Sequence, residues 1–566
     1  MTVKSSYSYD VIIIGSGNGG MTAAISAHDQ GLNVLIIEKS RLFGGSSATS
    51  GGGVWVPNNR YAKELEANDS LEEARTYIKH VSPKEKISDD LIETYLIKGP
   101  EMIDYLHENT HVKYMSLEHY PDYFPDDPGG KSGHRSMEPE PFYGDLLRED
   151  LKFLRGQHPQ TKGPMGINFT QVEGQILLGG LSGWVILFIK LLIKFLFDFP
   201  YRFTNFKDRR LTMGNAGIAR LRMSLKEREV PFWLNTSFKE FVFEGGKVTG
   251  IKAIKEGDEV TINARHGVVL ASGGFERNQE MRDKFLPKPS KTSWSAANLD
   301  NTGEVITEAI KIGGKTDQME SAWWSTVMQV PGEEKARLSM VDKSLPGAFC
   351  VNSNGERFSN ESQNYVSFVD EMYDKFSVGN PCIPCFMIFD SEYRKKRPCG
   401  PLLQSSMMPD SLVPNHWWDN SFLVKANSLE ELADKLSINK DGFMKTINKV
   451  NTFAAEGIDL DYKRGDSVYD RYYGDPSIKP NPCLGTVSKP PFYSITLYPG
   501  EMGTAGGLVI DSRARVLDSN NSHIPGLWAC GNCTSALLPR YPGPGSTLGP
   551  AMTFGYIAGR DIGRAN

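Results

Sequence analysis

A glycine-rich turn between two apolar runs, in residues 9–40 (YDVIIIGSGNGGMTAAISAHDQGLNVLIIEKS), limits the fold of this chain more than any other feature. The run before the turn predicts a buried strand, and the alanine-rich segment after it predicts a helix that leads to a second strand ending at Glu38. Gly15, Gly17 and Gly20 permit a tight turn and close approach of a pyrophosphate to the helix N-terminus, while Glu38 can accept hydrogen bonds from a ribose hydroxyl. The order of these parts predicts a Rossmann-like dinucleotide-binding unit rather than an ordinary βαβ unit.

Three further glycine-rich segments indicate which dinucleotide is bound. Residues 38–55 (EKSRLFGGSSATSGGGVW) form a second loop that NAD enzymes do not require, and the runs GVVLASGGFERN and GLWACGN predict two more strands that end on glycine. Remote segments that complete one nucleotide site favour FAD over NAD, because FAD is long and bound extended. The predicted cofactor-binding residues are Gly15, Ser16, Gly17, Asn18, Gly19, Gly20, Glu38, Lys39, Ser40, Gly44, Gly45, Ser46, Ser50, Gly51, Gly52, Gly53, Phe238, Ala271, Ser272, Gly273, Asn301, Gly531, Asn532, Gly545, Thr547 and Leu548.

Composition limits the size, compartment and partners of the chain. With 566 residues it is too long for one ordinary core, so two or more domains are expected. A hydrophobic content of 39%, a charged content of 23% and a formal charge of −5 indicate a globular protein without a nucleic-acid partner. The N-terminal region has no apolar signal segment before a cleavage site, which predicts a cytoplasmic protein.

Seven cysteines, an odd number, predict reduced thiols rather than a disulfide framework. The CxxC pairs Cys382/Cys385 and Cys530/Cys533 lie far apart in the chain, and Cys385 opens a strand-like run, CFMIFD. Buried free thiols are therefore a better interpretation than a zinc site, and we predict no metal.

The stretch RYPGPGSTLG, residues 540–549, combines an aromatic hydroxyl, two prolines that fix the backbone and glycines that permit close approach. Together with GSGNGGMTAA, EKSRLFGGSSATSGGGVWVP, RFSNESQNY and GTAGGLVID, it resembles the 3-ketosteroid Δ1-dehydrogenases of the fumarate reductase and succinate dehydrogenase flavoprotein group. The resemblance covers most of the chain except about residues 147–209, and it suggests a form with a membrane-associated insertion. The nucleotide loops are shared by the wider group, whereas the tyrosine motifs are far more specific.

The resemblance implies FAD-dependent 1,2-dehydrogenation of a 3-ketosteroid, in which a proton leaves carbon 2 and a hydride passes from carbon 1 to flavin N5. Tyr541 and the Gly545 amide would donate to the ketone oxygen in the manner of an oxyanion hole, and Tyr365 would be the base. A phenol with a pKa of about 10 is a poor base, so a second tyrosine must assist it. Tyr123 matches that position and Tyr120 is its rival. A rigid turn with a packed tyrosine is the structural alternative for residues 540–549.

The positions of the nucleotide motifs predict the domain layout and the fold class, an α/β protein with an α+β cap. Residues 1–321 and 501–566 form the FAD-binding domain, and residues 322–500 form an inserted catalytic cap that contains Tyr365. The cap includes the predicted strand CFMIFD and the predicted helix SLEELADKLSI. The loop after Glu38 contains no histidine or cysteine to attack the flavin methyl group, so FAD is expected to be bound without a covalent link.

Residues 147–209 form a predicted insertion, and its part 176–203 (ILLGGLSGWVILFIKLLIKFLFDFPYRF) is far more apolar than a soluble insertion needs. Lys190, Lys194 and Asp198 recur every four residues and would form one stripe on a helix. Two lysines near the centre cost about 2.5 to 3.5 kcal/mol each and roughly cancel a dozen apolar residues at about 0.3 to 0.6 kcal/mol each, so insertion across a bilayer would be marginal. A single crossing is also impossible, because nucleotide motifs lie on both sides of the segment.

An interfacial helix on the inner face of the cell membrane is therefore the interpretation of residues 176–203. Trp184 and the other aromatic residues would lie among the headgroups, and the side chains suited to anionic lipid are Lys190, Lys194, Arg202 and Lys207. This would give access to membrane-borne substrates such as cholest-4-en-3-one. A buried helix or an oligomer contact remains the alternative.

Other functions remain open on the same scaffold. Fumarate reduction needs arginines and histidines to clamp carboxylates, whereas the motifs found here are rich in tyrosine. A steroid 4,5-dehydrogenase is a nearer rival, and a membrane-bound electron-transfer flavoprotein subunit is the non-enzymatic alternative. An enzyme of this type also needs an external electron acceptor, for which a quinone is a candidate.

Overall fold

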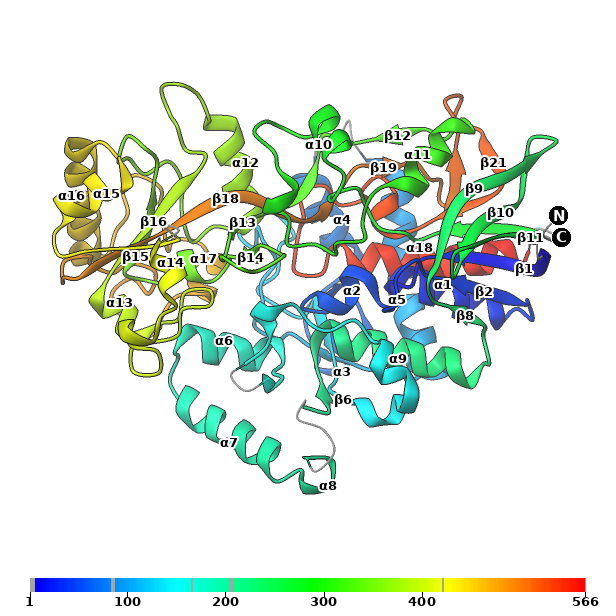
Figure 1. The fold of residues 1–566 in the computed structure, drawn as a ribbon, viewed down its shortest axis with the longest axis horizontal. Helices are drawn as coiled ribbons and strands as arrows, with labels where there is room; N and C mark the ends of the chain where they lie inside the picture. The colour runs from blue at the N-terminus through cyan, green and yellow to red at the C-terminus, as the bar shows by residue number, and fades with distance from the viewer. Residues whose placement is uncertain (1–5, 83–86, 164–165, 203–207, 420–421, 565–566) are drawn as a thin grey trace.

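The computed structural model describes residues 6–82, 87–163, 166–202, 208–419 and 422–564 (Figure 1). Two sheets lie at opposite ends of an elongated molecule. The sheet that contains β1 lies at the end where both chain termini are found, and the sheet that contains β16 lies at the other end (Figure 1). We call the first part the FAD-binding lobe and the second part the cap.

The eight-stranded sheet of the FAD-binding lobe has a parallel centre. β1 lies between β11 and β2, and the order of the main path is β20-β21-β11-β1-β2-β8, with β10 and β9 added beside β11. The bounds are β1 (Ser6–Ile14), β2 (Val34–Ile37), β8 (Phe232–Trp233), β9 (Thr236–Glu244), β10 (Lys247–Lys255), β11 (Asp258–Leu270), β20 (Arg515–Leu517) and β21 (His523–Ala529). The predicted strand, helix and strand of residues 9–40 are confirmed as β1, α1 (Asn18–His28) and β2. Apolar side chains at both faces of β1 are buried, as expected for a strand covered on both sides.

Two helices that are far apart in the sequence, α1 and α18 (Leu548–Ile562), lie side by side in the FAD-binding lobe (Figure 1). Small residues allow their close packing. A Cβ atom on Gly555 would lie 2.3 Å from the carbonyl oxygen of Gly19, and one on Gly559 would lie 2.0 Å from Ser26 Oγ. The C-terminal motif is therefore held against the N-terminal nucleotide motif.

The cap is built on a six-stranded sheet with the path β14-β13-β18-β16-β15, to which β17 adds beside β18. Its strands are β13 (Ala322–Met328), β14 (Arg337–Leu338), β15 (Ala348–Val351), β16 (Cys385–Asp390), β17 (Leu423–Ala426) and β18 (Phe492–Thr504). The predicted strand CFMIFD is confirmed as β16, and the predicted helix SLEELADKLSI is confirmed as α15 (Leu429–Leu436), capped by Ser428. Strand β18 runs without interruption through the predicted domain boundary at residue 500.

The remaining elements connect and cover the two sheets. The remaining α-helices are α2 (Gly45–Thr49), α3 (Arg60–Glu64), α4 (Leu71–Val81), α5 (Asp89–Asn109), α6 (Gln171–Gly179), α7 (Trp184–Leu196), α8 (Phe199–Arg202), α9 (Met213–Glu227), α10 (Gln279–Phe285), α11 (Glu304–Lys311), α12 (Tyr365–Lys375), α13 (Ser391–Lys396), α14 (Asn415–Asp419), α16 (Lys440–Glu456) and α17 (Val468–Tyr472). The remaining strands are β3 (Val54–Trp55), β4 (Tyr114–Ser116), β5 (Ser136–Pro139), β6 (Phe142–Tyr143), β7 (Arg210–Leu211), β12 (Thr316–Asp317) and β19 (Gly507–Leu508).

The apolar segment 176–203 is not one continuous helix, so that expectation is wrong. Helix α6 ends at Gly179 with Gly180 as its C-cap, and α7 begins after Gly183; Gly180 and Gly183 have left-handed backbone conformations with φ of 61° and 85°. Asp198 lies beyond the end of α7, where its carboxylate forms an ion pair of 2.8 Å with Arg209 Nε. It therefore does not continue the stripe of Lys190 and Lys194, because the chain has left the helix before reaching it.

Helix α7 protrudes from the lower edge of the molecule in Figure 1 and has two apolar faces. Leu191 and Phe195, only 5% and 7% exposed, pack against Ile167, Phe169 and Met213. The opposite face leaves large apolar side chains in solvent, namely Val185, Ile186, Ile189, Ile193 and Leu196, followed by Phe197 and Phe199. Within the described residues, no helix has the length and apolar character that a membrane crossing requires.

The expectations for the aromatic and the basic residues of this apolar segment have different outcomes. Phe195 is buried, so its predicted position among lipid headgroups is wrong, while Trp184 is partly exposed. Lys207 and Phe203 lie outside the described residues, as does the side chain of Arg202. Lys190 and Lys194 are exposed on α7.

All seven cysteines are free and buried, which confirms the prediction of reduced thiols. Cys382 lies in the cap, and its Sγ donates to the Met372 carbonyl oxygen. Cys533 lies in the FAD-binding lobe, where its Sγ contacts the Leu270 carbonyl oxygen.

A fully buried ion pair joins the cap strand β18 to helix α10. Both side chains are 0% exposed, and Arg282 Nη1 and Nη2 donate to the two carboxylate oxygens of Glu501 at 2.9 and 3.0 Å. We expect Glu501→Gln to lower the free energy of unfolding by about 3 to 5 kcal/mol, because it leaves the Arg282 charge buried without a counter-charge. Denaturant titration would measure this loss. The matched control is Glu308→Gln, which breaks the surface pair with Lys311 and should cost at most about 1 kcal/mol; equal losses would contradict the prediction.

Candidate active site

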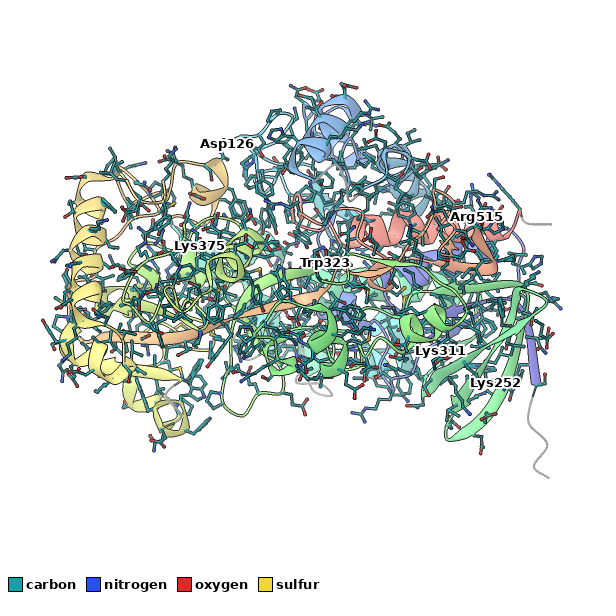
Figure 2. All side chains as sticks on the ribbon, turned by 90° about the horizontal axis from the view of Figure 1, so that it is seen from above. Asp126, Lys252, Lys311, Trp323, Lys375 and Arg515 are labelled. Carbon is teal, nitrogen blue, oxygen red and sulfur yellow. The ribbon has the colours of Figure 1, made fainter. Side chains whose placement is uncertain are left out.

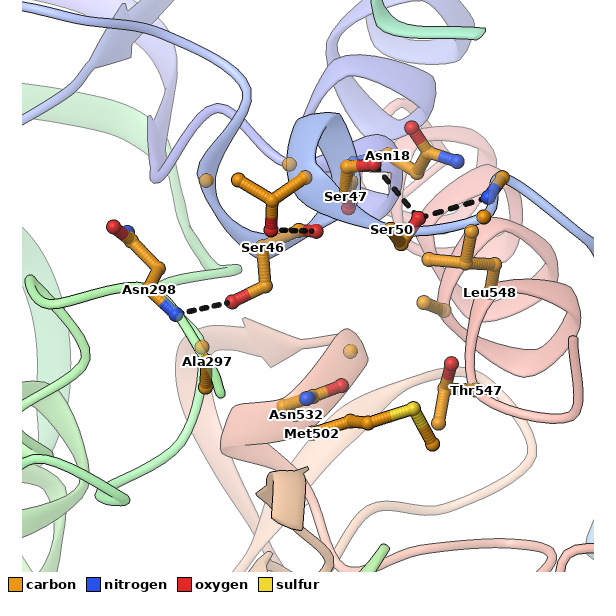
Figure 3. A pocket seen from close by; sticks show the side chains of 18 of the residues that line it. Asn18, Ser46, Ser47, Ser50, Ala297, Asn298, Met502, Asn532, Thr547 and Leu548 are labelled. Carbon is orange, nitrogen blue, oxygen red and sulfur yellow. Dashed lines mark hydrogen bonds between the residues drawn. The ribbon is translucent and has the colours of Figure 1, made fainter. Parts of the chain in front are cut away.

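One cavity extends from the nucleotide motifs of the FAD-binding lobe to the base of the cap (Figure 3). Every predicted cofactor-binding residue except Ser40 and Gly44 lines it, and so do Tyr120, Tyr123, Tyr365 and Tyr541. The structure therefore brings together segments that are more than 500 residues apart in the chain. Figure 3 shows Asn18 and Ser47 on one side of this space and Asn532 and Thr547 on the opposite side.

The nucleotide end of the cavity is organised around Glu38, which lies directly after β2. Ser16 Oγ donates to Glu38 Oε2 at 2.5 Å, and the Ser40 amide donates to Oε1 at 3.0 Å. Burial raises the pKa of Glu38, while these two hydrogen bonds oppose the rise. Ser40 and Gly44 thus lie behind the cavity wall and support it, since the Gly44 amide also donates to Ser16 Oγ at 2.9 Å.

The residues at the nucleotide end of the cavity fit FAD. A Cβ atom on Gly15, where φ is 108°, would lie 2.3 Å from the Ala271 carbonyl oxygen, so only glycine permits this close crossing of loops. Asn18 Oδ1 and Asn298 Oδ1 are buried, line the cavity and have no hydrogen-bond partner among the described residues. Trp323 Nε1, on the cap strand β13, is in the same situation, and Figure 2 shows Trp323 near the centre of the molecule. Unpaired buried polar groups of this kind are expected where a polar ligand completes their hydrogen bonds.

The three predicted catalytic tyrosines meet at the other end of the cavity. The hydroxyls of Tyr123 and Tyr365 are hydrogen-bonded to each other, and their ring centroids are 5.2 Å apart. The Tyr541 ring lies 6.1 Å from that of Tyr365 and 5.4 Å from that of Tyr123. Tyr120 does not take this position: its hydroxyl is hydrogen-bonded to that of Tyr473 at 2.6 Å.

The loop that carries Tyr541 and Gly545 is fixed by its carbonyl groups. The Pro542 carbonyl accepts from the Tyr123 amide at 2.8 Å and from the Tyr77 hydroxyl at 2.6 Å. The Pro544 carbonyl accepts from Ser136 Oγ at 2.7 Å. Gly545 has a φ of 101°, and a Cβ atom there would lie 2.5 Å from the carbonyl group of Gly53. The loop is therefore locked against β3 and the Tyr123 segment.

Desolvation dominates the electrostatics at the end of the cavity where the three tyrosines meet. Burial raises the pKa of Tyr365 well above its ordinary value, and the nearby Tyr541 and Tyr120 raise it further, while the hydrogen bond with Tyr123 lowers it. Burial also raises the pKa of Tyr541, against hydrogen bonds from Thr547, Tyr365 and the Gly545 amide. Tyr541 and Gly545 lie four residues apart on one loop, and both line the cavity. In this site burial outweighs the help that Tyr123 gives to a Tyr365 phenolate.

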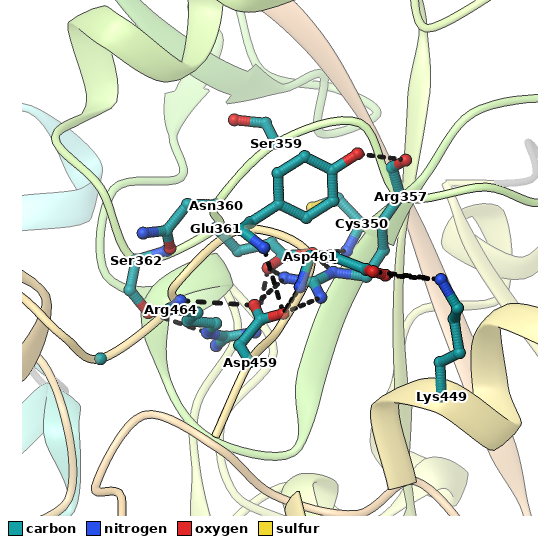
Figure 4. Close-up of polar contacts among 12 residues, drawn as sticks. Cys350, Arg357, Ser359, Asn360, Glu361, Ser362, Lys449, Asp459, Asp461 and Arg464 are labelled. Carbon is teal, nitrogen blue, oxygen red and sulfur yellow. Dashed lines mark hydrogen bonds and ion pairs between the residues drawn. The ribbon is translucent and has the colours of Figure 1, made fainter. Parts of the chain in front are cut away.

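A buried ionic network in the cap fixes the segment that leads to Tyr365 (Figure 4). Glu361 accepts from Arg357 Nη2 at 2.7 Å and from Arg464 Nη1 at 3.3 Å, and Arg357 also binds Asp459 at 2.8 Å. Arg464 Nε donates to Ser362 Oγ at 2.9 Å. Asn364 then caps α12 by accepting from the Ser367 amide, so Tyr365 begins a helix whose start is fixed on both sides.

Some cavity residues carried no sequence signal. Phe169, Gly174 and Gln175 belong to the insertion, yet they line the cavity, and Gln171 Nε2 donates to the Gly51 carbonyl at 3.0 Å. Asn298, three residues before the predicted Asn301, was also absent from the residues predicted from the sequence. Nothing in their spacing distinguishes these residues from ordinary loop or helix positions. Within the described residues, no group of three or more His, Cys, Asp or Glu side chains is arranged to hold a metal ion.

Comparison with known proteins gives consistent matches over the whole chain. The family model described as FAD binding domain matches residues 10–548. The chain is 40% identical to a 3-oxosteroid 1-dehydrogenase of Mycolicibacterium smegmatis, over 98% of this chain and 97% of that protein. It is 36% identical to a 3-oxosteroid 1-dehydrogenase of Comamonas testosteroni, over 98% and 96%. A crystal structure of a 3-ketosteroid Δ1-dehydrogenase from Sterolibacterium denitrificans, in complex with 1,4-androstadiene-3,17-dione, matches with a TM-score of 0.95 and 40% identity, covering 99% of this chain and 100% of that chain.

We expect the cofactor to be released by acid. The loop after Glu38 has no histidine or cysteine. Among the described residues the only cysteine along the cavity wall is Cys530, which is buried with its pKa raised by burial, so it is a poor nucleophile. Acid precipitation of the purified protein should leave the yellow colour in the supernatant. Colour that stays with the pellet would contradict non-covalent binding.

Proposed function

The chain belongs to the FAD binding domain family, among the 3-oxosteroid 1-dehydrogenases, and from this membership we propose that it introduces the 1,2 double bond into 3-ketosteroids. It is an FAD-dependent oxidoreductase. The observation that carries the proposal is the meeting of Tyr123, Tyr365 and Tyr541 beside Gly545 in the cavity that also holds the nucleotide motifs. We retain residues 322–500 as the proposed catalytic cap.

Ketone polarisation is the role that we propose for Tyr541 and Gly545. The proton on carbon 2 of a 3-ketosteroid is acidic only when charge that develops on the ketone oxygen is stabilised. A hydroxyl and an amide that reach the same point can supply two hydrogen bonds to that oxygen, and they act strongly because the site is buried. The loop contacts of Pro542 and Pro544 hold both donors in place before the substrate arrives.

Proton removal is the role that we propose for Tyr365, with Tyr123 as the tyrosine that assists it. When bound, FAD supplies the acceptor for the hydride that leaves carbon 1. The residues that would hold it are those of the nucleotide end, above all the loop of Gly15 to Gly20, Glu38 and Asn301. Tyr365 then faces the substrate from the cap, while Tyr541 and Gly545 face it from the FAD-binding lobe.

The residues of the cavity wall count against fumarate reduction but not against 4,5-dehydrogenation. Within the described residues no arginine lines the cavity, although a dicarboxylate such as fumarate needs arginine clamps. A 4,5-dehydrogenation would use the same polarised ketone, so product identification must separate it from 1,2-dehydrogenation.

We expect anaerobic mixing with a 3-ketosteroid to bleach the flavin absorbance and to yield the 1,2-unsaturated product. Tyr365→Phe should lower kcat by about 10²- to 10⁴-fold with FAD content and steroid binding almost unchanged, because a base acts in the transition state. Tyr541→Phe should weaken both kcat and binding, because it removes a donor to the ketone in substrate and enolate alike. Stopped-flow flavin reduction and steroid titration would measure these effects.

Two outcomes would contradict these predictions. A Tyr365→Phe enzyme that keeps most of its activity would show that another group is the base. Absence of bleaching by every 3-ketosteroid would favour an electron-transfer subunit.

We also propose that the insertion docks on the inner face of the cell membrane. The outer face of α7 exposes Ile186 at 72% and Phe197 at 67%, and Lys190 and Lys194 are exposed on the same helix. Full burial of one large apolar side chain yields about 1.5 to 3 kcal/mol, so several such residues together favour a lipid interface. The lysines add attraction to anionic headgroups.

A lipid bilayer is the proposed partner because the insertion also leads to the cavity. Helix α6 lines the cavity at Gly174 and Gln175 and is followed directly by α7. A sterol-like substrate with a long side chain, such as cholest-4-en-3-one, resides in the bilayer and could enter from that side. A quinone is the electron acceptor that we propose, since it dissolves in the same bilayer.

The exposed face of α7 gives a specific test of docking. A variant with Ile186→Ser, Ile189→Ser, Ile193→Ser and Phe197→Ser should lose co-sedimentation with phosphatidylglycerol-containing vesicles and activity on a long-chain steroid in those vesicles. Its activity on a water-soluble, side-chain-free steroid should persist, because the buried residues Leu191 and Phe195 are unchanged. The matched control replaces three exposed residues elsewhere, Val378, Ile458 and Leu460, with serine and should bind vesicles like the wild type. Equal loss on both substrates would assign the segment to the folded core.

A further inference from the structure

We propose that helix α6 is a strut between the FAD-binding lobe and the cap, and that Glu138 and Arg397 are positioning residues that hold its two ends. The strut sets the spacing at which Tyr365 of the cap faces Tyr541 and Gly545 of the FAD-binding lobe. The inference rests on the proposed function, because only a reaction that takes place between the two lobes depends on that spacing.

The N-terminal end of α6 is bound to the FAD-binding lobe. Glu138, a buried residue of β5, accepts hydrogen bonds from the Gln171 amide at 2.7 Å and from the Val172 amide at 3.5 Å. The Gln171 side chain also reaches this lobe, because its Nε2 donates to the Gly51 carbonyl at 3.0 Å. The first turn of α6 is therefore attached both to β5 and to the glycine loop of the nucleotide end.

The C-terminal end of α6 is bound to the cap. Arg397 is buried and directly follows α13, and its Nη1 donates to the carbonyl of Gly179, the last residue of α6, at 2.7 Å. Its Nη2 forms an ion pair with Asp475 at 2.5 Å. One turn before the end of α6, Gln175 Nε2 donates to the Tyr472 carbonyl at 2.8 Å. The last turn of α6 is therefore attached to two segments of the cap.

The charges at the two ends of α6 match the helix dipole. A helix carries partial positive charge at its N-terminus and partial negative charge at its C-terminus, so a carboxylate is favourable at the first and a guanidinium at the second. Glu138 and Arg397 have this arrangement and come from different lobes. Burial raises the pKa of Glu138 to about 7, against the amides of Gln171 and Val172, so its carboxylate form prevails above neutral pH.

Strand β5 connects the strut to the loop that we propose to bind the ketone. Ser136 and Glu138 are two residues apart on β5, so their side chains point to the same face of the strand. Ser136 Oγ donates to the Pro544 carbonyl at 2.7 Å, while Glu138 holds α6. A displacement of α6 therefore acts on the strand that also holds the loop of Tyr541 and Gly545.

The cap end of the strut leads to Tyr365. The Tyr472 carbonyl that Gln175 holds lies at the end of α17. Asn360, five residues before Tyr365, donates to Asp470 Oδ2 of the same helix at 2.9 Å. Movement of the strut is therefore transmitted through α17 to the segment that fixes the start of α12. The strut itself lies beside the cavity, which α6 lines at Gly174 and Gln175.

The test is a double-mutant cycle of Glu138→Gln and Arg397→Lys. The first variant removes the charge and one acceptor oxygen, and the second keeps a positive charge beside Asp475 but loses the two-nitrogen fork that also reaches Gly179. Anaerobic stopped flow with a water-soluble, side-chain-free 3-ketosteroid, at about pH 8.5 where Glu138 is ionised, gives the limiting rate of flavin reduction. Each single variant should slow that rate by about two- to tenfold, the range for one lost buried hydrogen bond. FAD content should not change, because neither residue lines the cavity.

The double variant gives the decisive result. Helix α6 has nine residues and is about 13 Å long, and residues more than about 10 Å apart normally have independent effects, so their fold-changes multiply. A strut fails once either end is released. The double variant should therefore be no slower than the slower single variant, within about twofold. Arg397→Met, which removes both contacts of Arg397, should give the same result in combination with Glu138→Gln.

Arg394→Lys is the matched control. Arg394 lies three residues before Arg397 and is as deeply buried, but its fork donates to the carbonyls of Leu403 and Met408, which belong to the cap. Loss of this fork destabilises the cap without releasing an end of α6. Its effect on flavin reduction should therefore multiply with that of Glu138→Gln.

Three results would overturn the strut. The first is a pair of fold-changes for Glu138→Gln and Arg397→Lys that multiply in the double variant, and the second is a limiting rate that neither single variant changes. The third is non-additivity that the Arg394→Lys control shares, because this would indicate general destabilisation. Each of these results leaves the proposed function intact if the steroid bleaches the flavin. A wild-type flavin that no 3-ketosteroid bleaches refutes the function and the catalytic role of the strut together.

Discussion

The hydrogen bond between the Tyr123 and Tyr365 hydroxyls joins the FAD-binding lobe to the cap at the centre of the proposed chemistry. Much of the surrounding structure serves to hold its two ends. On one side, Pro542 accepts from the Tyr123 amide, and this contact also fixes the loop that carries Tyr541. On the other side, the ionic network of Glu361 fixes the start of α12. A small relative movement of the two lobes would break a contact of this kind, which explains why rigid, buried polar groups surround it.

Burial in this site has two opposite effects. It strengthens the hydrogen bonds that Tyr541 and Gly545 can give to a ketone oxygen, because the local dielectric constant is low. It also opposes ionisation of Tyr365, the group that we propose as the base.

The insertion contributes to both the interior and the surface. Its helix α6 completes the cavity wall and binds the flavin-side loop through Gln171, while α7 leaves an apolar face in solvent. Glycines at 180 and 183 separate the two helices, so each can follow a different surface. One short segment therefore connects the proposed entrance for lipid-borne substrates to the residues that surround the substrate.

The sequence alone determined the nucleotide-binding unit, because a pyrophosphate at a helix N-terminus demands glycines and a ribose hydroxyl demands an acid at the end of the next strand, and Gly15, Gly20 and Glu38 have that spacing. It also indicated Tyr365, Tyr541 and Gly545 through motifs that resemble a family, and helix α15 through its cap at Ser428. Only the tertiary structure distinguished Tyr123 from Tyr120, since two tyrosines three residues apart in an irregular segment carry no periodic signal. It also divided residues 176–203 into separate helices, because left-handed glycines break a helix that apolar composition alone would extend. The cavity residues from the insertion, such as Gln175, and the pairing of Tyr120 with Tyr473 depend on contacts between segments distant in the chain, and no local pattern encodes such contacts.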